Sequence, residues 1–297
     1  MISSAQFLPD RFLIEIAGDD RASFLQGLLT NDVEHLTEGS GRFAGLLSPQ
    51  GKILFDFFVV NLGGRFIIDC PKKLAPDLTK RLNFYKLRAK VAIAEMNTAW
   101  RVAAAWGEGA GEALKDRAAV TYRDPRLGAL GYRLFLDPEK GGLTLPATSE
   151  PAASEYEAMR IGLGVPEGGK DYAYGETFPH EACFDLLNGV DFKKGCFVGQ
   201  EVVSRMQHRG TARTRVLCVL ANAPLPEAGG AIAADGFTIG QVGSVWGNRG
   251  VALVRLDRAR EALANGQSLK MGDVAIELKV PSWASYSLDA QPQGAAS

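Results

Sequence analysis

Cysteine and histidine are scarce in this sequence of 297 residues. It contains four cysteines, none in a Cys-x-x-Cys pair, and three histidines. Structural zinc sites are usually built from closely spaced cysteines and histidines, so we expect no bound metal. A disulfide framework is not expected either, because a chain of this length buries a large core without covalent help. The sequence therefore predicts free thiols.

The sequence also lacks an excess of charge of one sign and any long apolar run. With 33 basic and 34 acidic residues, its formal net charge is −1, which gives the whole molecule no general attraction to nucleic acid or anionic membranes. No stretch of about 18 apolar residues is present, so no membrane span is predicted. The first twenty residues already contain acidic side chains, and they lack a basic segment followed by an apolar run. Both features argue against a targeting signal. We expect a monomer in the cytoplasm.

The first two thirds of the chain alternate strand and helix patterns. Strands are predicted at 11–16, 43–47, 53–60, 65–69, 91–94, 100–106 and 130–136. Helices are predicted after Asp19-Asp20, which we expect to cap the first of them, and at 74–85, 110–117 and 154–162. The turn Ser48-Pro49-Gln50-Gly51 joins two of the strands as a hairpin. Hairpins with interspersed helices indicate an α+β sheet domain.

The pattern of predicted elements changes after Arg209-Gly210. Short strands broken by glycine and proline are predicted at 215–221, 240–246, 250–256 and 274–280, with one helix at 257–264. This pattern indicates a small β-barrel or sandwich. We therefore predict a first domain at 1–212, a β-domain at 213–288 and a disordered tail at 289–297.

The segment from Lys193 to Arg215 is locally basic. It contains six basic residues and one acid, Glu201, a net charge of +5 in a chain of net −1. Such a segment favours an anionic partner, such as a carboxylate-bearing cofactor or a nucleic-acid phosphate, over a bland solvated face. Cys196 lies in it beside two lysines, just before a helix predicted to begin at Gln200. From the residues alone, Cys196 is either a reactive thiol or a small buried filler.

The octapeptide Lys194–Glu201, KGCFVGQE, resembles the K-G-C-[FY]-x-G-Q-E signature of the YgfZ-type folate-binding proteins. These are relatives of a mitochondrial iron–sulfur assembly factor and of the glycine-cleavage T-protein, an aminomethyltransferase. The similarity continues in FLQGLLTNDV at 24–33, LLSPQGKILFDFFV at 46–59, RIGLGVPEGGKDY at 160–172 and VVSRMQHRGTARTR at 202–215. These stretches extend over most of the first 215 residues.

The resemblance implies a duplicated antiparallel-sheet, T-protein-like α+β domain that binds tetrahydrofolate, followed by a C-terminal β-barrel. It also implies a role in assembling or repairing iron–sulfur clusters, with client enzymes that include one that thiomethylates tRNA. The expected partners are folate, in some forms polyglutamylated, and iron–sulfur client or assembly proteins. Direct binding of tRNA is the least supported of these expectations.

The resemblance also assigns site residues. Cys196 is the functional cysteine, expected at the mouth of a folate cavity, and Asp56 is a folate contact or base. The residues implied to bind the cofactor are Arg160, Lys194, Gly195, Phe197, Gly199, Gln200, Glu201, Arg205 and Arg215. Basic side chains among them suit the glutamate carboxylates of folate.

Two departures from the T-protein pattern count against glycine-cleavage chemistry. Phe55 stands at the first position of its Asp-Asp pair, leaving only Asp56, and Gly162 stands where it has an acid that binds the pterin. Whether the protein is an enzyme stays open. The alternatives to an iron–sulfur accessory protein are a tetrahydrofolate-dependent one-carbon transferase or demethylase that uses Asp56, and a non-catalytic module that docks tRNA or a tRNA-modifying enzyme.

Overall fold

The computed structural model describes residues 4–96, 99–114, 118–139, 155–210 and 212–289. Contacts divide the chain into two interleaved compact units. The first comprises Met1–Tyr156 and Leu187–Arg205, and the second comprises Glu157–Leu186 and Met206–Ser297. The predicted 213–288 segment therefore packs in one unit with an earlier stretch of chain. No helix in the described part is long and apolar enough to cross a membrane.

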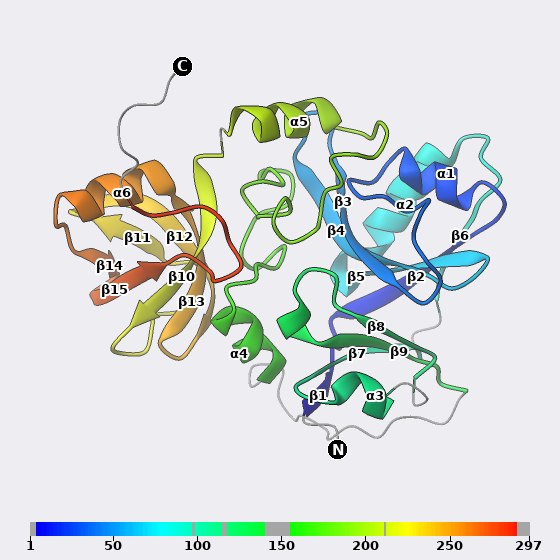
Figure 1. Ribbon diagram of the computed structural model, residues 1–297, viewed down its shortest axis with the longest axis horizontal. Helices are drawn as coiled ribbons and strands as arrows, with labels where there is room; N and C mark the ends of the chain where they lie inside the picture. Colours follow the sequence, from blue (N-terminus) through cyan, green and yellow to red (C-terminus); the bar gives the residue numbers. More distant parts are fainter. Residues whose placement is uncertain (1–3, 97–98, 115–117, 140–154, 211, 290–297) are drawn as a thin grey trace. The chain divides into compact units, whose positions relative to one another are not determined.

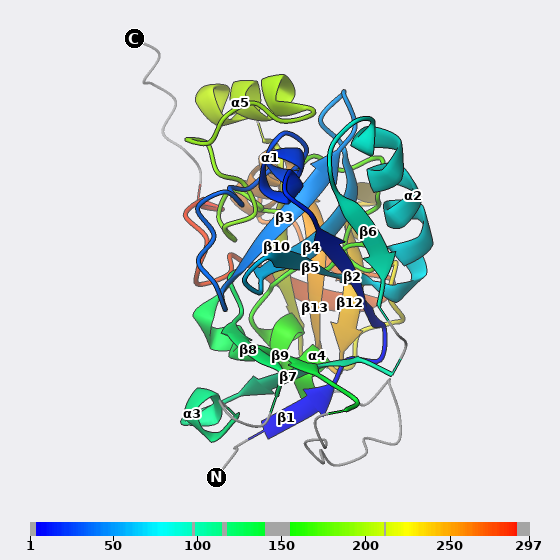
Figure 2. The same cartoon turned by 90° about the vertical axis from the view of Figure 1, so that its right-hand side faces the viewer.

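A five-stranded antiparallel sheet forms the larger part of the first unit (Figure 1). Its order is β3 (Gly41–Leu47), β4 (Ile53–Asn61), β5 (Arg65–Pro71), β2 (Arg11–Ala17) and β6 (Ala92–Glu95). Helix α2 (Ala75–Lys86), which follows the short η1 (Lys72–Leu74), packs on β2 and β6 (Figure 2). Leu78 and Leu82 on α2 are fully buried in the main core, as their helical spacing predicts.

The predicted hairpin between β3 and β4 is confirmed. The N–H of Gly51 donates to the carbonyl of Ser48 at 2.8 Å, and the N–H of Ser48 donates to the carbonyl of Lys52 at 2.8 Å. Gly51 has φ +80°, a conformation that glycine adopts without a steric penalty. The register then aligns Gly45 with Asp56.

The predicted capping of the first helix is wrong. Asp20 directly precedes α1 (Arg21–Gln26), but its side chain makes no capping hydrogen bond. Instead, Asp20 Oδ2 accepts the N–H of Lys90 at 2.7 Å, from the chain just before β6. The carboxylate thus binds a backbone N–H that lies 70 residues away in sequence, a partner that local spacing cannot reveal.

A second antiparallel sheet completes the first unit. Its order is β1 (Ser4–Phe7), β7 (Arg101–Trp106), β9 (Tyr132–Leu136) and β8 (Val120–Arg123). The chain between these strands forms α3 (Ala110–Leu114) and η2 (Gly128–Leu130). Part of the predicted helix at 110–117 lies outside the described residues. The two antiparallel sheets confirm the predicted α+β class.

The second unit contains a closed six-stranded barrel in the order β10-β13-β12-β11-β14-β15. The strands are β10 (Thr214–Ala221), β11 (Ala231–Ala234), β12 (Phe237–Trp246), β13 (Arg249–Arg255), β14 (Leu269–Met271) and β15 (Val274–Lys279). Helix α6 (Leu256–Ala264) buries Leu256, Ala259 and Ala262 in the same core. The predicted C-terminal barrel is confirmed. The predicted tail lies outside the described residues, except for Asp289.

Two further helices include residues of the segments that resemble the family. Helix α4 (Glu155–Gly162) contains Arg160, and α5 (Gln200–Arg209) begins four residues after the signature cysteine. The predicted helix start at Gln200 is confirmed.

Candidate functional site

The signature cysteine lies in an ordered loop, residues 193–199, which we call the Cys196 loop. An acidic side chain begins it, since Asp191 Oδ1 accepts the N–H groups of Lys193 at 2.7 Å and Lys194 at 3.2 Å. An aspartate that binds backbone N–H groups two or three residues ahead fixes a tight turn. The backbone conformation at the start of the Cys196 loop is therefore fixed by Asp191.

Lys194 ties the Cys196 loop to the chain that follows α1. Its ammonium donates to the carbonyl oxygens of Gln26 at 2.7 Å, Leu29 at 2.5 Å and Asn31 at 3.0 Å. Carbonyls at and beyond the end of a helix lack intrahelical partners, so a cation there satisfies them and complements the helix dipole. We call this arrangement the Lys194 anchor.

Burial costs the ammonium some of its hydration and lowers the pKa of Lys194 to about 8, although Asp32, Asp191 and Glu34 oppose the shift. The anchor uses all three N–H donors of the ammonium. Lys194 thus holds the loop in place.

Thr30 also joins the chain after α1 to the residues just before the Cys196 loop. Its hydroxyl donates to the carbonyl of Gly189 at 2.6 Å and accepts the N–H of Gly45 on β3 at 2.8 Å. Its own carbonyl accepts the N–H of Asp191 at 2.9 Å. Two stretches of chain that lie about 160 residues apart in sequence are therefore joined by a small buried network.

The far end of the Cys196 loop is fixed by packing. Phe197 is buried, its ring centroid lies 5.3 Å from the Lys194 ammonium, and its N–H donates to Gln200 Oε1 at 3.3 Å. Gly199 has φ +81°, and a Cβ there would lie 2.6 Å from the carbonyl oxygen of Ser48. The start of α5 thus packs directly on the β3–β4 turn, which explains why the signature needs a glycine at this position.

Cys196 is exposed between these two fixed points, whereas the other three cysteines are buried or partly buried. Burial raises the pKa of Cys70 to about 12, and it also raises the pKa of Cys183 and of Cys218. Raised pKa values keep those three thiols protonated and unreactive. Cys196 is therefore the thiol that solvent and a partner can reach.

The other predicted site residues lie in different settings. Asp56 is 7 % exposed on β4, Gly195 is exposed, and Glu201 and Arg205 are exposed on α5. The contacts described above bring Lys194, Phe197, Gly199 and Gln200 together around the cysteine.

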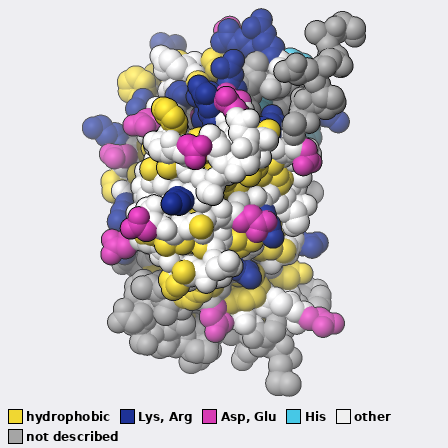
Figure 3. Space-filling view, turned by 90° about the vertical axis from the view of Figure 1, so that its left-hand side faces the viewer, with side chains coloured by type: hydrophobic (Ala, Val, Ile, Leu, Met, Phe, Trp, Pro, Cys, Tyr) yellow, Lys and Arg dark blue, Asp and Glu magenta, His cyan; other side chains and the backbone are white. Residues whose placement is uncertain are grey.

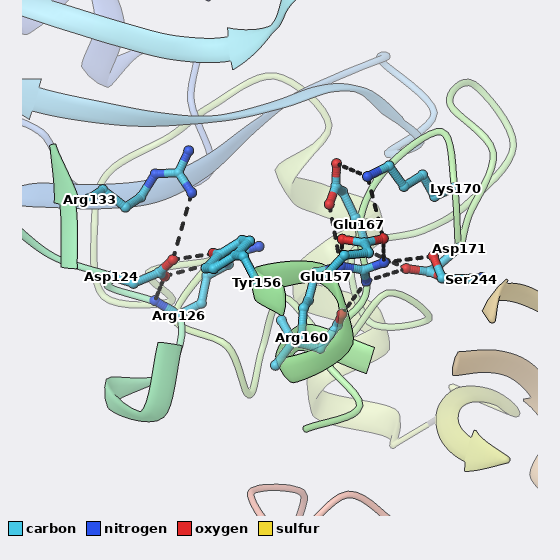
Figure 4. A network of polar contacts seen from close by, with 11 residues as sticks. Asp124, Arg126, Arg133, Tyr156, Glu157, Arg160, Glu167, Lys170, Asp171 and Ser244 are labelled. Carbon is cyan, nitrogen blue, oxygen red and sulfur yellow. Dashed lines mark hydrogen bonds and ion pairs between the residues drawn. The ribbon is translucent and has the colours of Figure 1, made fainter. Parts of the chain in front are cut away.

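Arg160 is fully buried within the second unit and has several partners there. Its guanidinium donates to Asp171 at 2.6 Å, to both carboxylate oxygens of Glu157 and to Ser244 at 2.6 Å, as Figure 4 shows. It also donates to the carbonyl of Val165 at 2.6 Å. Arg160 therefore ties α4 to the barrel strand β12, and a ligand could bind it only by displacing one of these groups.

Arg215 is also paired inside the second unit. It makes a bidentate contact with Asp185 at 2.7 and 2.9 Å and donates to the carbonyl of His180. Lys194 and Arg215 are both held by partners inside the protein. The net charge available to an outside ligand is therefore smaller than the +5 counted from the sequence. Exposed charges remain at Lys193, Arg205, Arg209 and Arg213. Figure 3 shows Lys and Arg side chains gathered along the upper edge of one face.

Sequence reasoning missed a buried charge cluster in the first unit. Asp69 on β5 accepts Arg11 at 2.7 Å from β2 and Arg133 at 2.7 Å from β9, so it joins the two sheets. Asp124 makes a bidentate contact with Arg126, and its Oδ2 lies 4.0 Å from Arg133 (Figure 4). Asp69 lies 58 and 64 residues from its two arginine partners, too far apart in sequence for any spacing rule to join them.

The fold defines the class of protein first. The chain superposes on the aminomethyltransferase T of the glycine cleavage system from Bartonella henselae with a TM-score of 0.71, covering 94 % of this chain and 86 % of that one. The two sequences are only 17 % identical, so this likeness concerns the fold alone. Residues 213–286 match the family model for the C-terminal beta-barrel domain of CAF17.

The sequence relatives are more specific. The human mitochondrial iron–sulfur cluster assembly factor IBA57 is 32 % identical over 301 residues, which cover 93 % of this chain and 84 % of that protein. The Mus musculus protein is 31 % identical over 303 residues with the same coverage. The Mycosarcoma maydis homologue is 33 % identical over 235 residues, 74 % of this chain and 58 % of that longer protein. The chain belongs to the IBA57 family.

These findings confirm the resemblance stated from the octapeptide and correct one prediction. The predicted cytoplasmic location is wrong, because the matched relatives are mitochondrial proteins. The prediction relied on the missing basic segment near the N-terminus, and such an absence does not determine a compartment.

Proposed function

We propose that this protein is a tetrahydrofolate-binding accessory factor for the assembly or repair of iron–sulfur clusters and that Cys196 is its reactive group. One observation carries the proposal: the exposed thiol lies in a loop that the Lys194 anchor and the buried Phe197 hold on both sides. A loop that served only as a connection would not need this support.

The thiol suits a transient role on an iron–sulfur client. Clusters are held by about four ligands, and one cysteine supplies a single thiolate. Cys196 therefore acts on a cluster whose other ligands come from the client protein. Membership in the IBA57 family supports this assignment, because its named members are iron–sulfur cluster assembly factors. The clients include enzymes that thiomethylate tRNA.

Folate binding belongs to the same proposal. We infer that Asp56, nearly buried on β4, contacts the cofactor, and that Glu201 and Arg205 contribute from α5. Support comes from the aminomethyltransferase fold and from the sequence resemblance to folate-binding proteins. Phe55 and Gly162 replace acids of the T-protein, so the cofactor serves this protein without glycine-cleavage chemistry.

Titration with tetrahydrofolate under anaerobic conditions tests the cofactor assignment. We expect saturable binding that Asp56→Asn weakens about tenfold, the worth of a lost charge-assisted hydrogen bond. Asp77→Asn, at an exposed position on α2, is the matched control and should bind like the wild type. Absence of saturable binding by the wild-type protein would remove folate from the proposal.

Turnover separates the accessory role from the enzyme alternative. A panel of methylated and aminomethylated amines is incubated with the protein and tetrahydrofolate. We expect no formation of methylene- or methyltetrahydrofolate. Catalytic turnover that depends on Asp56 would favour a one-carbon transferase instead.

A further inference from the structure

The first unit contains a cleft that the proposed function does not use. Its volume is 880 Å³, within the range of about 300–1,000 Å³ typical of small-molecule sites. The wall is formed by the start of β3, by the end of β8 with the turn after it, and by residues 188–193. We call it the Arg123 cleft.

Three basic side chains line the Arg123 cleft: Arg42, Arg123 and Lys193. All three are exposed, and within the described residues none has a carboxylate partner. The guanidinium of Arg123 lies over Gly128, where a Cβ would come within 2.3 Å of its Nη2. That glycine leaves room for the cation inside the cleft.

The two carboxylates of the cleft wall are already committed. Asp124 is buried and makes a bidentate contact with Arg126, at 3.1 and 2.8 Å. Asp191 accepts the two N–H groups that begin the Cys196 loop. Asp191 keeps its negative charge, so beside the paired Asp124 the cleft wall holds three unpaired cations against one carboxylate, a net charge of +2.

The buried charge cluster behind the wall adds to the positive potential. It contains three arginines, Arg11, Arg126 and Arg133, against two aspartates, Asp69 and Asp124, an excess of one positive charge. All three guanidinium groups lie over the ring of Phe58, at 5.6, 4.9 and 4.2 Å from its centroid. Charges in a poorly hydrated interior are weakly screened, so this excess acts on an anion in the cleft.

Aromatic surface completes the Arg123 cleft. Phe192 and Tyr132 both line the cleft. Phe192 is 38 % exposed, and Tyr132 is half-buried. The ring of Tyr122 packs on Gly41, where a Cβ would come within 2.6 Å of it. Its hydroxyl is buried and has no hydrogen-bond partner in the described part of the chain. Unpaired cations beside ring surfaces match a ligand that combines negative charge with a planar ring.

We propose that the Arg123 cleft binds a small organic anion in which phosphate or carboxylate groups are attached to a planar ring system. Arg42, Arg123 and Lys193 pair with the anionic groups, and the ring lies against the aromatic wall. The inference is independent of the proposed role of Cys196, and the cleft is a second site beside the Cys196 loop, which Lys193 begins.

Calorimetric titration at low ionic strength tests the proposal with four probes. ADP combines phosphate with a ring, and pyrophosphate has phosphate alone. Benzene-1,3,5-tricarboxylate combines carboxylate with a ring, and citrate has carboxylate alone. We expect at least one ring-bearing probe to bind with a dissociation constant below about 1 mM and more tightly than its ringless counterpart. The stronger of the two ring-bearing probes identifies the anionic group.

Variants locate the binding in the cleft. Arg42→Gln and Arg123→Gln should each weaken the preferred probe about tenfold, the worth of one charge-assisted hydrogen bond. Arg81→Gln, at an exposed arginine on α2, is the matched control and should bind like the wild type. Thermal unfolding of each variant checks that the fold is retained.

Three results would overturn the inference: no binding of any probe, equal loss of binding in Arg81→Gln, or unchanged binding in the Arg42→Gln/Arg123→Gln double variant. Equal affinity for a probe and its ringless counterpart would remove the ring from the proposed ligand.

Discussion

At the scale of single residues, Lys194 links the chemistry of the signature to the fold. The K-G-C pattern suggested a positive charge beside the thiol that would attract an anion. In the structure the same charge satisfies three carbonyl oxygens and is itself partly buried. The lysine of the signature thus has a structural role that its position beside the cysteine does not reveal.

Replacing Lys194 should destabilise the first unit. Lys194→Met keeps the length of the side chain but leaves three carbonyl groups without a donor, and we expect a loss of about 1–3 kcal/mol in the free energy of unfolding. Lys193→Met, at the exposed neighbour, is the matched control and should change stability little. Urea denaturation measures both. Equal effects of the two substitutions would show that the anchor contributes nothing.

The stability that Lys194 contributes should depend on pH. Burial lowers its folded-state pKa to about 8, below the value of 10.5 for the free side chain. Between these values the unfolded chain holds the proton and the folded chain does not, so stability rises with pH across this window. Below pH 8 both states are charged, and the cost of burying the ammonium is fully present.

The difference in unfolding free energy between the wild type and Lys194→Met isolates this effect from other titrations. We expect the difference to shift in favour of the wild type between pH 7 and pH 9.5. A constant difference, or a shift in the opposite direction, would contradict the lowered pKa.

At the scale of elements, the contact between Gly51 and Gly199 positions the Cys196 loop. A Cβ on Gly199 would lie 2.6 Å from the Ser48 oxygen and 3.0 Å from the Cα of Gly51. The hairpin turn and the start of α5, two segments of the family pattern, therefore pack together without intervening side chains. This contact gives a physical reason why the two segments occur together in the family pattern.

Gly199→Ala should therefore loosen the start of α5. The residue has φ +81° and no room for a methyl group, so we expect a loss of about 1–3 kcal/mol. Gly195→Ala is the control, because a Cβ there meets nothing within 4 Å. Thermal melting compares the two, and similar melting temperatures for both variants would refute the tight contact.

The elements were largely predictable, and the exceptions have physical causes. Apolar periodicity and turn residues located β2, β3, β4, β5, α2 and α5. Short strands such as β11 and β14 were missed, because three or four residues beside glycine carry too little pattern, and barrel closure makes them strands. Asp20 was misassigned because a distant backbone N–H competes for its carboxylate.

At the scale of the whole molecule, buried ion pairs join segments that the sequence keeps apart. Asp69 lies 58 residues from Arg11 and 64 residues from Arg133. For Arg160 and Arg215 the sequence predicted a ligand, whereas the structure gives both side chains internal partners. An arginine in a family pattern does not show whether its partner is a cofactor or the protein itself. The loop residues were predictable because their spacing is local.

Asp69→Asn should be strongly destabilising, because it leaves Arg11 and Arg133 buried without a carboxylate. We expect a loss of about 3–5 kcal/mol. Glu15→Gln breaks the Glu15–Arg65 pair, whose side chains are 29 % and 45 % exposed, and should cost at most about 1 kcal/mol. Chemical denaturation of both variants provides the comparison. A loss for Asp69→Asn no larger than that for Glu15→Gln would mean that the pairs do not hold the sheets together.

The central claim is that the exposed thiol of Cys196 is the group through which this protein supports iron–sulfur enzymes. The most direct measurement is the activity of an iron–sulfur enzyme in cells that lack the chromosomal copy and carry wild type, Cys196→Ser or Cys218→Ser at matched protein levels. We predict that Cys218→Ser restores activity like the wild type and that Cys196→Ser does not, although it folds and binds tetrahydrofolate normally. Full restoration of activity by Cys196→Ser would contradict the account.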